Sequence, residues 1–307
     1  MENPLVSVYT CVYNRADKIH RVFNSMKAQT YKNLEHIVVD DGSTDNVLQL
    51  LEQYSKEVSF PVYIYHKENG GKHTVTNVAW NHCNGEYLVQ LDSDDELFPD
   101  GIEKLVGLLD NVPAEKRNEY WCYVGRCVTQ KSDNMVGLPY PDGINSQSRE
   151  DASRTDFQVG GEKIALISAS SIGSMRFPEP VGVKFVSERV VWEPMKEKYK
   201  SWYSNLIIRK YYVDEGNNLS NQKISRQTVI NKVWSCRWQL ENRKKYQTKG
   251  LKCLLPYCFG FFLTSKEYRK GNPYLVHGGF VLYLLQLILA VPAWVSHFII
   301  SIILKFD

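Results

Sequence analysis

The stretch "EYLVQLDSDD", residues 86–95, places an alternating run of strand-forming residues directly before Asp92, Asp94 and Asp95. Carboxylates this close repel one another, so these residues form either a solvated turn or a site for a hard cation that offsets the repulsion. A D-x-D pair is frequent by chance. The surrounding sequence must therefore decide between the two interpretations.

The residues before this stretch alternate between two periodicities. Short runs rich in β-branched and aromatic residues predict strands at 6–13, 34–40, 61–66 and 86–91. Amphipathic patterns between these runs, and another that begins at Pro99, predict helices. Strands that alternate with helices at this spacing predict an α/β fold, with a mostly parallel, Rossmann-like sheet and helices on both of its faces.

Polar clusters follow three of these predicted strands. Asn14 and Arg15 follow the first strand, "DDGSTD" (40–45) lies at the end of the second, and "DSDD" (92–95) at the end of the fourth. Because ligands bind beyond the carboxyl ends of strands in open parallel sheets, the three clusters predict one site at one edge of the sheet. A cation site at the aspartates is favoured for the same reason.

Five segments, taken in order, carry a resemblance to a known family. The segments "VSVYTCVYNR" (6–15), "QTYKNLEHIVVDDGSTD" (29–45), "ENGGKHTVTNVAW" (68–80), "GEYLVQLDSDD" (85–95) and "SERVVWE" (187–193) together resemble the family 2 glycosyltransferases of the GT-A fold. The resemblance implies an inverting enzyme of the hexosyltransferase class that uses a nucleotide sugar. It also implies that residues 1–110 bind the nucleotide sugar and that residues 111–220 bind the acceptor.

Three residues are expected to hold the nucleotide if the resemblance is followed position by position. Tyr13 resembles the family residue that stacks on the base, and Asp41 resembles the carboxylate that accepts a hydrogen bond from the uracil imide. Lys72 is expected to reach the diphosphate. Two alternatives stay open: Tyr13 packs in the protein, and Asp41 caps the turn that follows it.

The D-x-D of the family corresponds to Asp92 and Asp94. The resemblance implies that Asp94 ligates Mn²⁺ or Mg²⁺ and that Asp92 contacts the ribose or the water molecules of the metal. Such a cation would stabilise the departing nucleoside diphosphate. Asp95 is expected to support the loop or to cap the next helix.

Inversion at the sugar carbon requires a base that takes the proton of the acceptor hydroxyl. The segment "SERVVWE" stands where the family usually has an acidic pair, and Glu188 is the candidate for this base. Arg189 replaces the second acid of the pair, so Glu193 remains the second candidate. The alternative for Glu188 is a carboxylate that only stabilises the first turn of a helix.

The composition of the chain limits the classes of partner it could bind and the cellular compartment in which it could work. The net charge of +3 over 307 residues is too small to indicate a nucleic-acid partner, and the seven cysteines include no C-x-x-C pair, which favours a reducing compartment. Residues 221–273 form a basic linker within a longer stretch, 196–252, that has 14 Lys and Arg against four Asp and Glu. The N-terminus shows no secretory signal pattern. We expect a protein in the cytosol or on the cytoplasmic face of the cell membrane.

The segment from 274 to 304 contains no Asp, Glu, Lys or Arg over 31 residues. As a helix it would be about 46 Å long, compared with about 30 Å for the hydrocarbon core of a bilayer. Residues 274–307 are therefore predicted to form hydrophobic, membrane-associated helices. Pro292 leaves a kinked, re-entrant or in-plane arrangement open, and a buried pair of core helices is the alternative.

Three functions are compatible with these patterns. The first is a metal-dependent inverting glycosyltransferase that moves a sugar, from UDP by the Asp41 assignment, to a hydroxyl of a glycan or lipid-linked acceptor in surface polysaccharide synthesis. The second is a polyprenyl-phosphate glycosyltransferase, and the third is a non-catalytic glycan-binding relative. The Q-x-x-R-W motif of processive polymerising relatives is absent, because "SCRWQ" (235–239) lacks its Gln, which favours transfer of single sugars.

Overall fold

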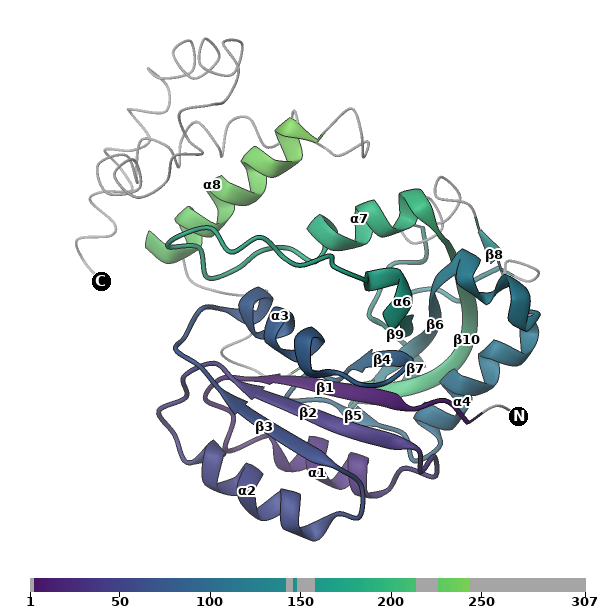
Figure 1. Ribbon diagram of the computed structural model, residues 1–307, viewed down its shortest axis with the longest axis horizontal. Helices are drawn as coiled ribbons and strands as arrows, with labels where there is room; N and C mark the ends of the chain where they lie inside the picture. The colour runs from purple at the N-terminus through teal and green to yellow at the C-terminus, as the bar shows by residue number, and fades with distance from the viewer. Residues whose placement is uncertain (1–2, 142–145, 148–157, 214–225, 243–307) are drawn as a thin grey trace. The chain divides into compact units, whose positions relative to one another are not determined.

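The computed structural model describes residues 3–141, 146–147, 158–213 and 226–242 (Figure 1). The chain divides into two compact units. The first unit comprises Met1–Gly70, Thr74–Arg176 and Val191–Asp214, and the second comprises Gly71–His73, Phe177–Val190 and Glu215–Asp307. The predicted division into four regions stays a prediction.

Four parallel strands form one half of the sheet in the first unit. Their spatial order is β3-β2-β1-β4, and β1 is in continuous register with β2 over seven residue pairs. Residues on both faces of β1 and β2 are buried, as a sheet covered on two sides requires. The strands are β1 (Val6–Val12), β2 (Leu34–Asp40), β3 (Val62–His66) and β4 (Tyr87–Gln90).

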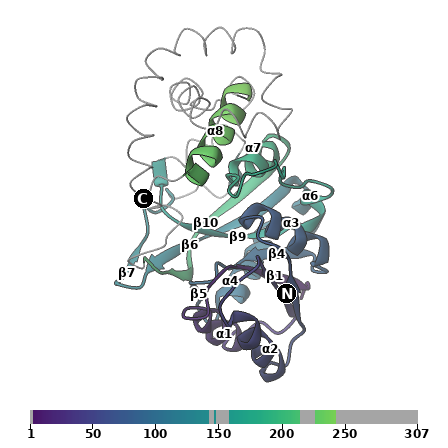
Figure 2. The same ribbon diagram turned by 90° about the vertical axis from the view of Figure 1, so that its left-hand side faces the viewer.

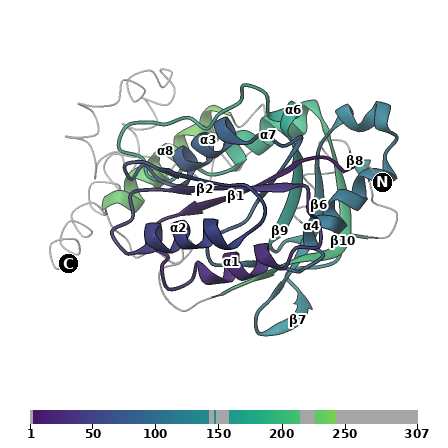
Figure 3. The same ribbon diagram turned by 60° about the horizontal axis from the view of Figure 1, so that its bottom comes forward.

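Beyond β4 the sheet is mixed, which corrects the expectation of a mostly parallel sheet. β9 (Lys163–Ser168) is antiparallel to both β4 and β6 (Tyr120–Thr129), and β10 (Lys200–Tyr211) is parallel to β6. β5 (Glu96–Leu97) is antiparallel to β10. Residues 131–162 have no hydrophobic period, so the direction of the strand that follows them, β9, could not be predicted from the sequence. The short strands β7 (Ser132–Met135) and β8 (Ser146–Gln147) are antiparallel to β6 and β10, and β7 projects from the sheet (Figures 2 and 3).

Helices cover both faces of the parallel half, as predicted. α1 (His20–Lys27) and α2 (Val47–Glu57) lie on one face, where Val22, Met26 and Leu51 are fully buried (Figure 1). α3 (Lys72–His82) lies on the other face, where the ring of His82 stacks on Tyr65 at 3.9 Å between centroids. Further α-helices among the described residues are α4 (Gly101–Gly107), α6 (Ala169–Ile172), α7 (Arg189–Lys198) and α8 (Arg226–Glu241), and 3₁₀ turns span Leu108–Asn111 and Ala114–Glu119.

Within the second unit, side chains of α8 hold the segment 177–190. The side chain of Asn231 accepts a hydrogen bond from the backbone of Lys184 at 2.9 Å, and Gln227 donates to the carbonyl of Gly182 at 2.8 Å. Gln227 and Asn231 are one helical turn apart, so they present both contacts on one side of α8.

Across the described residues, the structure contains no helix with the length and apolar character that a membrane crossing requires. The apolar segment 274–304 lies outside the described residues, as does most of the basic linker 221–273. The predicted membrane-associated helices therefore stay a prediction.

Candidate functional site

The ends of β1, β2 and β3 form a row at the carboxyl edge of the sheet. The three strands end in register, and the next residue after each is Tyr13, Asp41 and Lys67. The backbone N–H groups of Asp41 and Lys67 donate to the last residue of the neighbouring strand, at 2.8 and 3.0 Å, and so continue the ladder. An aromatic ring, a carboxylate and an amine are thereby set side by side.

Asp41 is a buried carboxylate that organises the loop after β3. Its Oδ1 accepts from the Lys67 ammonium at 3.0 Å and from the backbone N–H of Gly70 at 2.8 Å, and its Oδ2 accepts from the Asn69 amide at 3.2 Å. Lys67 was not among the sequence-predicted residues, although its place directly after a strand, one row from Asp41, was visible in the sequence. The predicted contact between Asp41 and uracil stays a prediction.

Tyr13 lies outside the hydrophobic core. Its side chain is 47% exposed, which disfavours the alternative of a packing tyrosine. The chain turns sharply after it, because Asn14 adopts a left-handed backbone with φ of +48°. Asn14 is fixed there by hydrogen bonds with Ser43 and Thr44, at 2.9 and 2.8 Å. The turn leaves the Tyr13 ring at the surface of the edge.

The D-x-D residues lie on a tight turn after β4. The backbone N–H of Asp95 donates to the carbonyl of Asp92 at 3.2 Å, which places Ser93 and Asp94 at the tip of the turn. Both carboxylate oxygens of Asp92 are engaged: Oδ1 accepts from the Gln90 amide at 3.2 Å, and Oδ2 lies 3.3 Å from Nη1 of Arg209.

Asp94 has a different environment from Asp92. Its carboxylate lies 3.9 Å from the Arg15 guanidinium, and its backbone carbonyl accepts from Arg21 at 3.1 Å. Burial and the neighbouring charge of Asp92 raise the pKa of Asp94, while Arg15 opposes the shift. Its surroundings thus disfavour the ionised form of the carboxylate at the tip of the turn.

Asp95 is fully buried and supports the turn, as expected. Its Oδ1 accepts from the backbone N–H of Tyr212 at 2.9 Å, and its Oδ2 lies 3.2 Å from Arg209. Burial raises the pKa of Asp95 to about 7, although the positive charge of Arg209 acts in the opposite direction.

The donor atoms of the turn suit a hard cation. Within the described residues, no three His, Cys, Asp or Glu side chains gather as a complete metal site. Mg²⁺ and Mn²⁺ prefer oxygen ligands, and Mg²⁺ is usually bound by one or two carboxylates together with substrate phosphates and water. Asp94 and Asp92 fit this incomplete set, because added positive charge would offset the burial and the neighbouring charge that raise the pKa of Asp94.

Sequence reasoning missed Arg209. It lies on β10, which pairs with β5 directly after the aspartate turn, and Arg209 is the register partner of Leu97. A single arginine inside the apolar run "LIIRKYY" (206–212) was the available signal. Nothing in the sequence could place it 117 positions away, beside Asp92.

The predicted base and the predicted diphosphate ligand belong to the second unit. Glu188 and Lys72 form an ion pair there, with 3.4 Å between Oε1 and Nζ. Glu188 directly precedes α7, and its side chain is 45% exposed, whereas Glu193 is buried at 7%. A proton acceptor for a substrate needs access, so this contrast favours Glu188 over Glu193.

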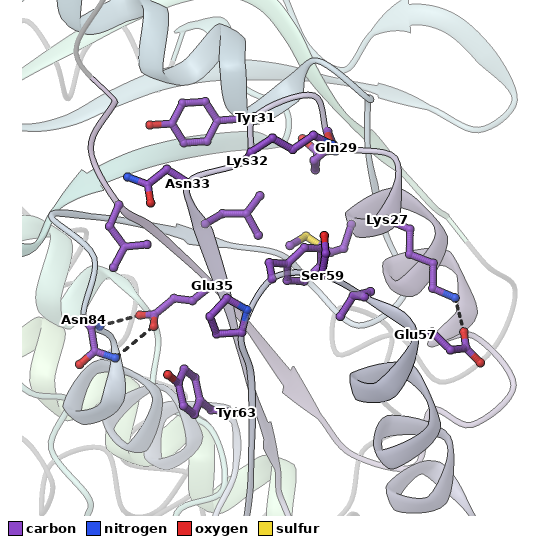
Figure 4. Close-up of a pocket in the computed structure, with 16 residues that line it drawn as sticks. Lys27, Gln29, Tyr31, Lys32, Asn33, Glu35, Glu57, Ser59, Tyr63 and Asn84 are labelled. Carbon is purple, nitrogen blue, oxygen red and sulfur yellow. Dashed lines mark hydrogen bonds and ion pairs between the residues drawn. The ribbon is translucent and has the colours of Figure 1, made fainter.

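A groove of about 780 Å³ lies at the opposite, amino edge of the sheet (Figure 4). Its charged side chains are paired: Glu35 accepts from Ser7, beside the groove, at 2.5 Å and twice from Asn84, at 2.7 and 3.0 Å, and Lys27 pairs with Glu57. None of the sequence-predicted site residues lines this groove.

Two sequence comparisons bear on this arrangement. Residues 7–115 match the model of "Glycosyl transferase family 2". The chain is similar to an uncharacterized glycosyltransferase of Haemophilus influenzae, with 36% identity over 47% of this chain and 44% of the relative. It is also similar to the chondroitin synthase of Pasteurella multocida, with 43% identity over 33% of this chain and 10% of the relative. The chain spans less than half the length of the curated relatives it matches.

Solved structures share the fold. Residues 1–349 of S. aureus TarS, in complex with UDP-GlcNAc, superpose with a TM-score of 0.63 at 17% identity, over 95% of this chain and 79% of that chain. The mannosyltransferase PcManGT from Pyrobaculum calidifontis, in complex with GDP-Man and Mn²⁺, gives a TM-score of 0.57 at 16% identity, over 95% and 81%. At these identities the likeness establishes a GT-A-like α/β fold with a mixed sheet.

Proposed function

We propose that this chain, a member of the family 2 glycosyltransferases, transfers a single sugar from a UDP-sugar to a hydroxyl of a glycan or lipid-linked acceptor. The observation that carries the proposal is the carboxyl edge of the sheet, where Tyr13, Asp41 and the aspartate turn follow three neighbouring strands. A structural neighbour binds UDP-GlcNAc and the similar Pasteurella protein is a chondroitin synthase, which supports a UDP donor and a polysaccharide product.

Each residue at the edge has a proposed task toward the donor. The exposed ring of Tyr13 stacks on the base, and the Asp41 carboxylate accepts the imide proton, which only uracil and thymine offer between two carbonyls. Asp94 would ligate Mn²⁺ or Mg²⁺, and Asp92 would contact the ribose or the water molecules of the metal. The cation, when bound, supplies Lewis-acid stabilisation of the leaving nucleoside diphosphate.

Glu188 is the proposed general base. Its carboxylate is exposed, and an acceptor hydroxyl must lose its proton as it attacks the sugar carbon. Its ion partner Lys72 is the proposed ligand of the diphosphate, since an ammonium group is a point charge suited to phosphate oxygens.

The test combines two measurements on the same protein. Purified protein should release UDP from a UDP-sugar in the presence of Mn²⁺, and Glu188→Gln should lower single-turnover transfer by about 10² to 10⁴-fold while the variant still binds the donor. Glu193→Gln serves as the matched control. Normal transfer by Glu188→Gln to a hydroxyl acceptor would remove Glu188 from the mechanism.

The polyprenyl-phosphate alternative is separated by the same variant. A phosphate acceptor is already ionised and needs no base, so its glycosylation would continue after Glu188→Gln. The non-catalytic alternative predicts donor binding without any release of UDP from a panel of UDP- and GDP-sugars.

We also propose that the protein works on the cytoplasmic face of the cell membrane, anchored by residues 274–307. The uncharged run at 274–304 supports this, together with the basic stretch 196–252, which anionic headgroups would attract. Removal of 274–307 should release the protein from membranes into a soluble fraction at high salt. A truncated chain that still sediments with membranes at high salt would place the anchor elsewhere.

A further inference from the structure

A buried arginine, Arg209, contacts two of the three carboxylates of the aspartate turn. Nη1 of Arg209 lies 3.3 Å from Oδ2 of Asp92 and 3.2 Å from Oδ2 of Asp95, so one nitrogen joins the two outer aspartates of the turn. Asp94, between them in sequence, lies at the tip and has Arg15 at 3.9 Å. The turn therefore divides into two anchored carboxylates and one at its tip.

Arg209 is held rigidly enough to fix these positions. Its side chain is almost fully buried, its Nε lies 3.3 Å from the Cys127 sulfur, and its Nη2 lies 3.4 Å from both Glu162 and the carbonyl of Lys163. The planar guanidinium uses all three of its nitrogens. A buried cation is costly to desolvate, and the nearby carboxylates offset that cost.

A purely structural role would be met by Asp95 alone. Asp95 is as buried as Arg209 and also receives the backbone N–H of Tyr212, so this pair already ties β10 to the turn. The second contact, to Asp92, reaches a side chain that is 30% exposed. That contact connects the buried cation to the surface of the proposed donor site.

We infer that Arg209 is a positioning residue of the donor site, which fixes and neutralises Asp92 so that Asp94 presents the carboxylate for a divalent cation. The inference rests on the proposed function. Gln90 completes the arrangement from the other side, because its amide donates to Oδ1 of Asp92 and its own carbonyl accepts from the Tyr9 hydroxyl at 2.9 Å. Asp92 is thus oriented by one donor on each oxygen before any ligand arrives.

A conservative substitution separates charge from geometry. Arg209→Lys keeps the positive charge and loses the fork that joins Asp92 to Asp95. We expect the affinity for UDP with Mn²⁺, measured by calorimetry, to fall about 10- to 100-fold, as for other groups that orient metal ligands. Affinity for UDP without Mn²⁺ should change less than about threefold, because the base contacts lie elsewhere on the edge.

The matched control is Arg126→Lys. Arg126 is an equally buried arginine on the neighbouring strand β6, and its guanidinium donates to the backbone carbonyls of Val136 and Leu138, at 2.7 and 2.8 Å. Its substitution tests the general effect of a lost buried guanidinium. Equal losses of Mn²⁺-dependent UDP affinity in both variants would overturn the inference.

A double-mutant cycle tests whether Arg209 acts through Asp92. In an Asp92→Asn background, Arg209→Lys should weaken Mn²⁺-dependent UDP binding less than about threefold, because the positioned charge is already gone. An undiminished effect in that background would contradict the inference. Failure of the wild-type protein to bind UDP with or without Mn²⁺ would instead contradict the proposed function.

Gln90→Leu provides a second route if Arg209→Lys does not fold. It removes the donor to the other oxygen of Asp92 and leaves Arg209 in place. The Mn²⁺-dependent affinity for UDP should fall about fivefold, the effect of one hydrogen bond. Unchanged affinity in a folded Gln90→Leu protein would show that the orientation of Asp92 is unimportant.

Discussion

The two edges of the parallel half-sheet use polar residues in opposite ways. At the amino edge, the Glu35 carboxylate accepts hydrogen bonds from the neutral donors Ser7 and Asn84, so its charge is already stabilised by its neighbours. At the carboxyl edge, Asp92, Asp94 and Asp95 share one turn, and burial and mutual repulsion raise the pKa of Asp94 and Asp95. The concave groove therefore lies at the edge where the charges are paired, and the proposed site lies at the edge where they are not balanced.

The largest effect is expected from Asp94→Asn at the carboxyl edge. Loss of the tip carboxylate should reduce Mn²⁺-dependent UDP affinity by at least about 100-fold, since even residues that only orient metal ligands contribute 10- to 100-fold. Calorimetry with and without Mn²⁺ measures this. Glu35→Gln at the amino edge is the control, with unchanged UDP affinity and a loss of about 1–3 kcal/mol in unfolding free energy. Wild-type affinity in Asp94→Asn would remove the metal assignment.

Asp41→Ala tests the base-reading part of the same edge. The variant should bind UDP more weakly by about 1–3 kcal/mol, the contribution of a charge-assisted hydrogen bond. Because Asp41 also holds the loop after β3 through Lys67, Asn69 and Gly70, part of any loss comes from loop disorder. Competition with GDP separates the two causes: equal losses for UDP and GDP would mean that Asp41 only orders the loop.

A pH-dependent stability is expected near the amino edge. His36 is fully buried between Thr10 and Tyr54, with 3.0 Å to each hydroxyl, and burial lowers the pKa of His36 to about 3. The unfolded chain takes up a proton near pH 6.5 and the folded chain does not, so stability is complete above that pH and declines as pH falls towards 3. The loss attributable to His36 between pH 7 and pH 5 is about 2 kcal/mol.

Urea unfolding of the wild type and of His36→Gln at several pH values isolates this contribution. Terms common to both proteins, including the opposing one from Asp95, whose raised pKa makes acid stabilising, cancel in the difference. The difference in unfolding free energy should shrink as the pH falls. A difference that is constant from pH 7 to pH 5 would mean that His36 is protonated in the folded protein.

The smallest effect is expected at the rim of the groove. Lys27 and Glu57 form an exposed ion pair between the ends of α1 and α2 (Figure 4). Lys27→Ala should cost less than about 1 kcal/mol in unfolding free energy, and less still at high salt, because water and ions screen exposed pairs. A loss of more than about 2 kcal/mol in unfolding free energy, measured by urea unfolding, would show that this ion pair contributes substantially to the stability of the amino edge.

Local patterns predicted the parallel half of the fold because each of its elements carries its own period. The run "LEHIVVD" gave β2 with its true bounds, and the spacing of Val22 and Met26 gave the buried face of α1. In the mixed half of the sheet, the direction of β9 could not be predicted, because residues 131–162, which precede it, have no hydrophobic period.

The candidate site divides in the same way. The rule about strand ends picked out the polar clusters that contain Asp41 and Asp94, because it applies to each strand separately. The roles expected of these two residues and of Tyr13 came from the resemblance to the family, which local segments of sequence carry. Arg209 escaped because its role depends on the pairing of β10 with β5, a contact between residues more than 100 positions apart. Long-range pairing of this kind has no signature in a single sequence.

The shared register of β1, β2 and β3 fixes the spacing of the backbone positions at the proposed nucleotide site. Neighbouring strands lie about 4.8 Å apart, so Tyr13, Asp41 and Lys67 begin from backbone positions spread over about 10 Å, and main-chain hydrogen bonds set these positions. Substitution of one of these side chains leaves the main-chain hydrogen bonds between the strand ends in place. A designed library at these three positions can therefore vary the proposed contacts to the nucleotide while the backbone positions that carry them stay constant.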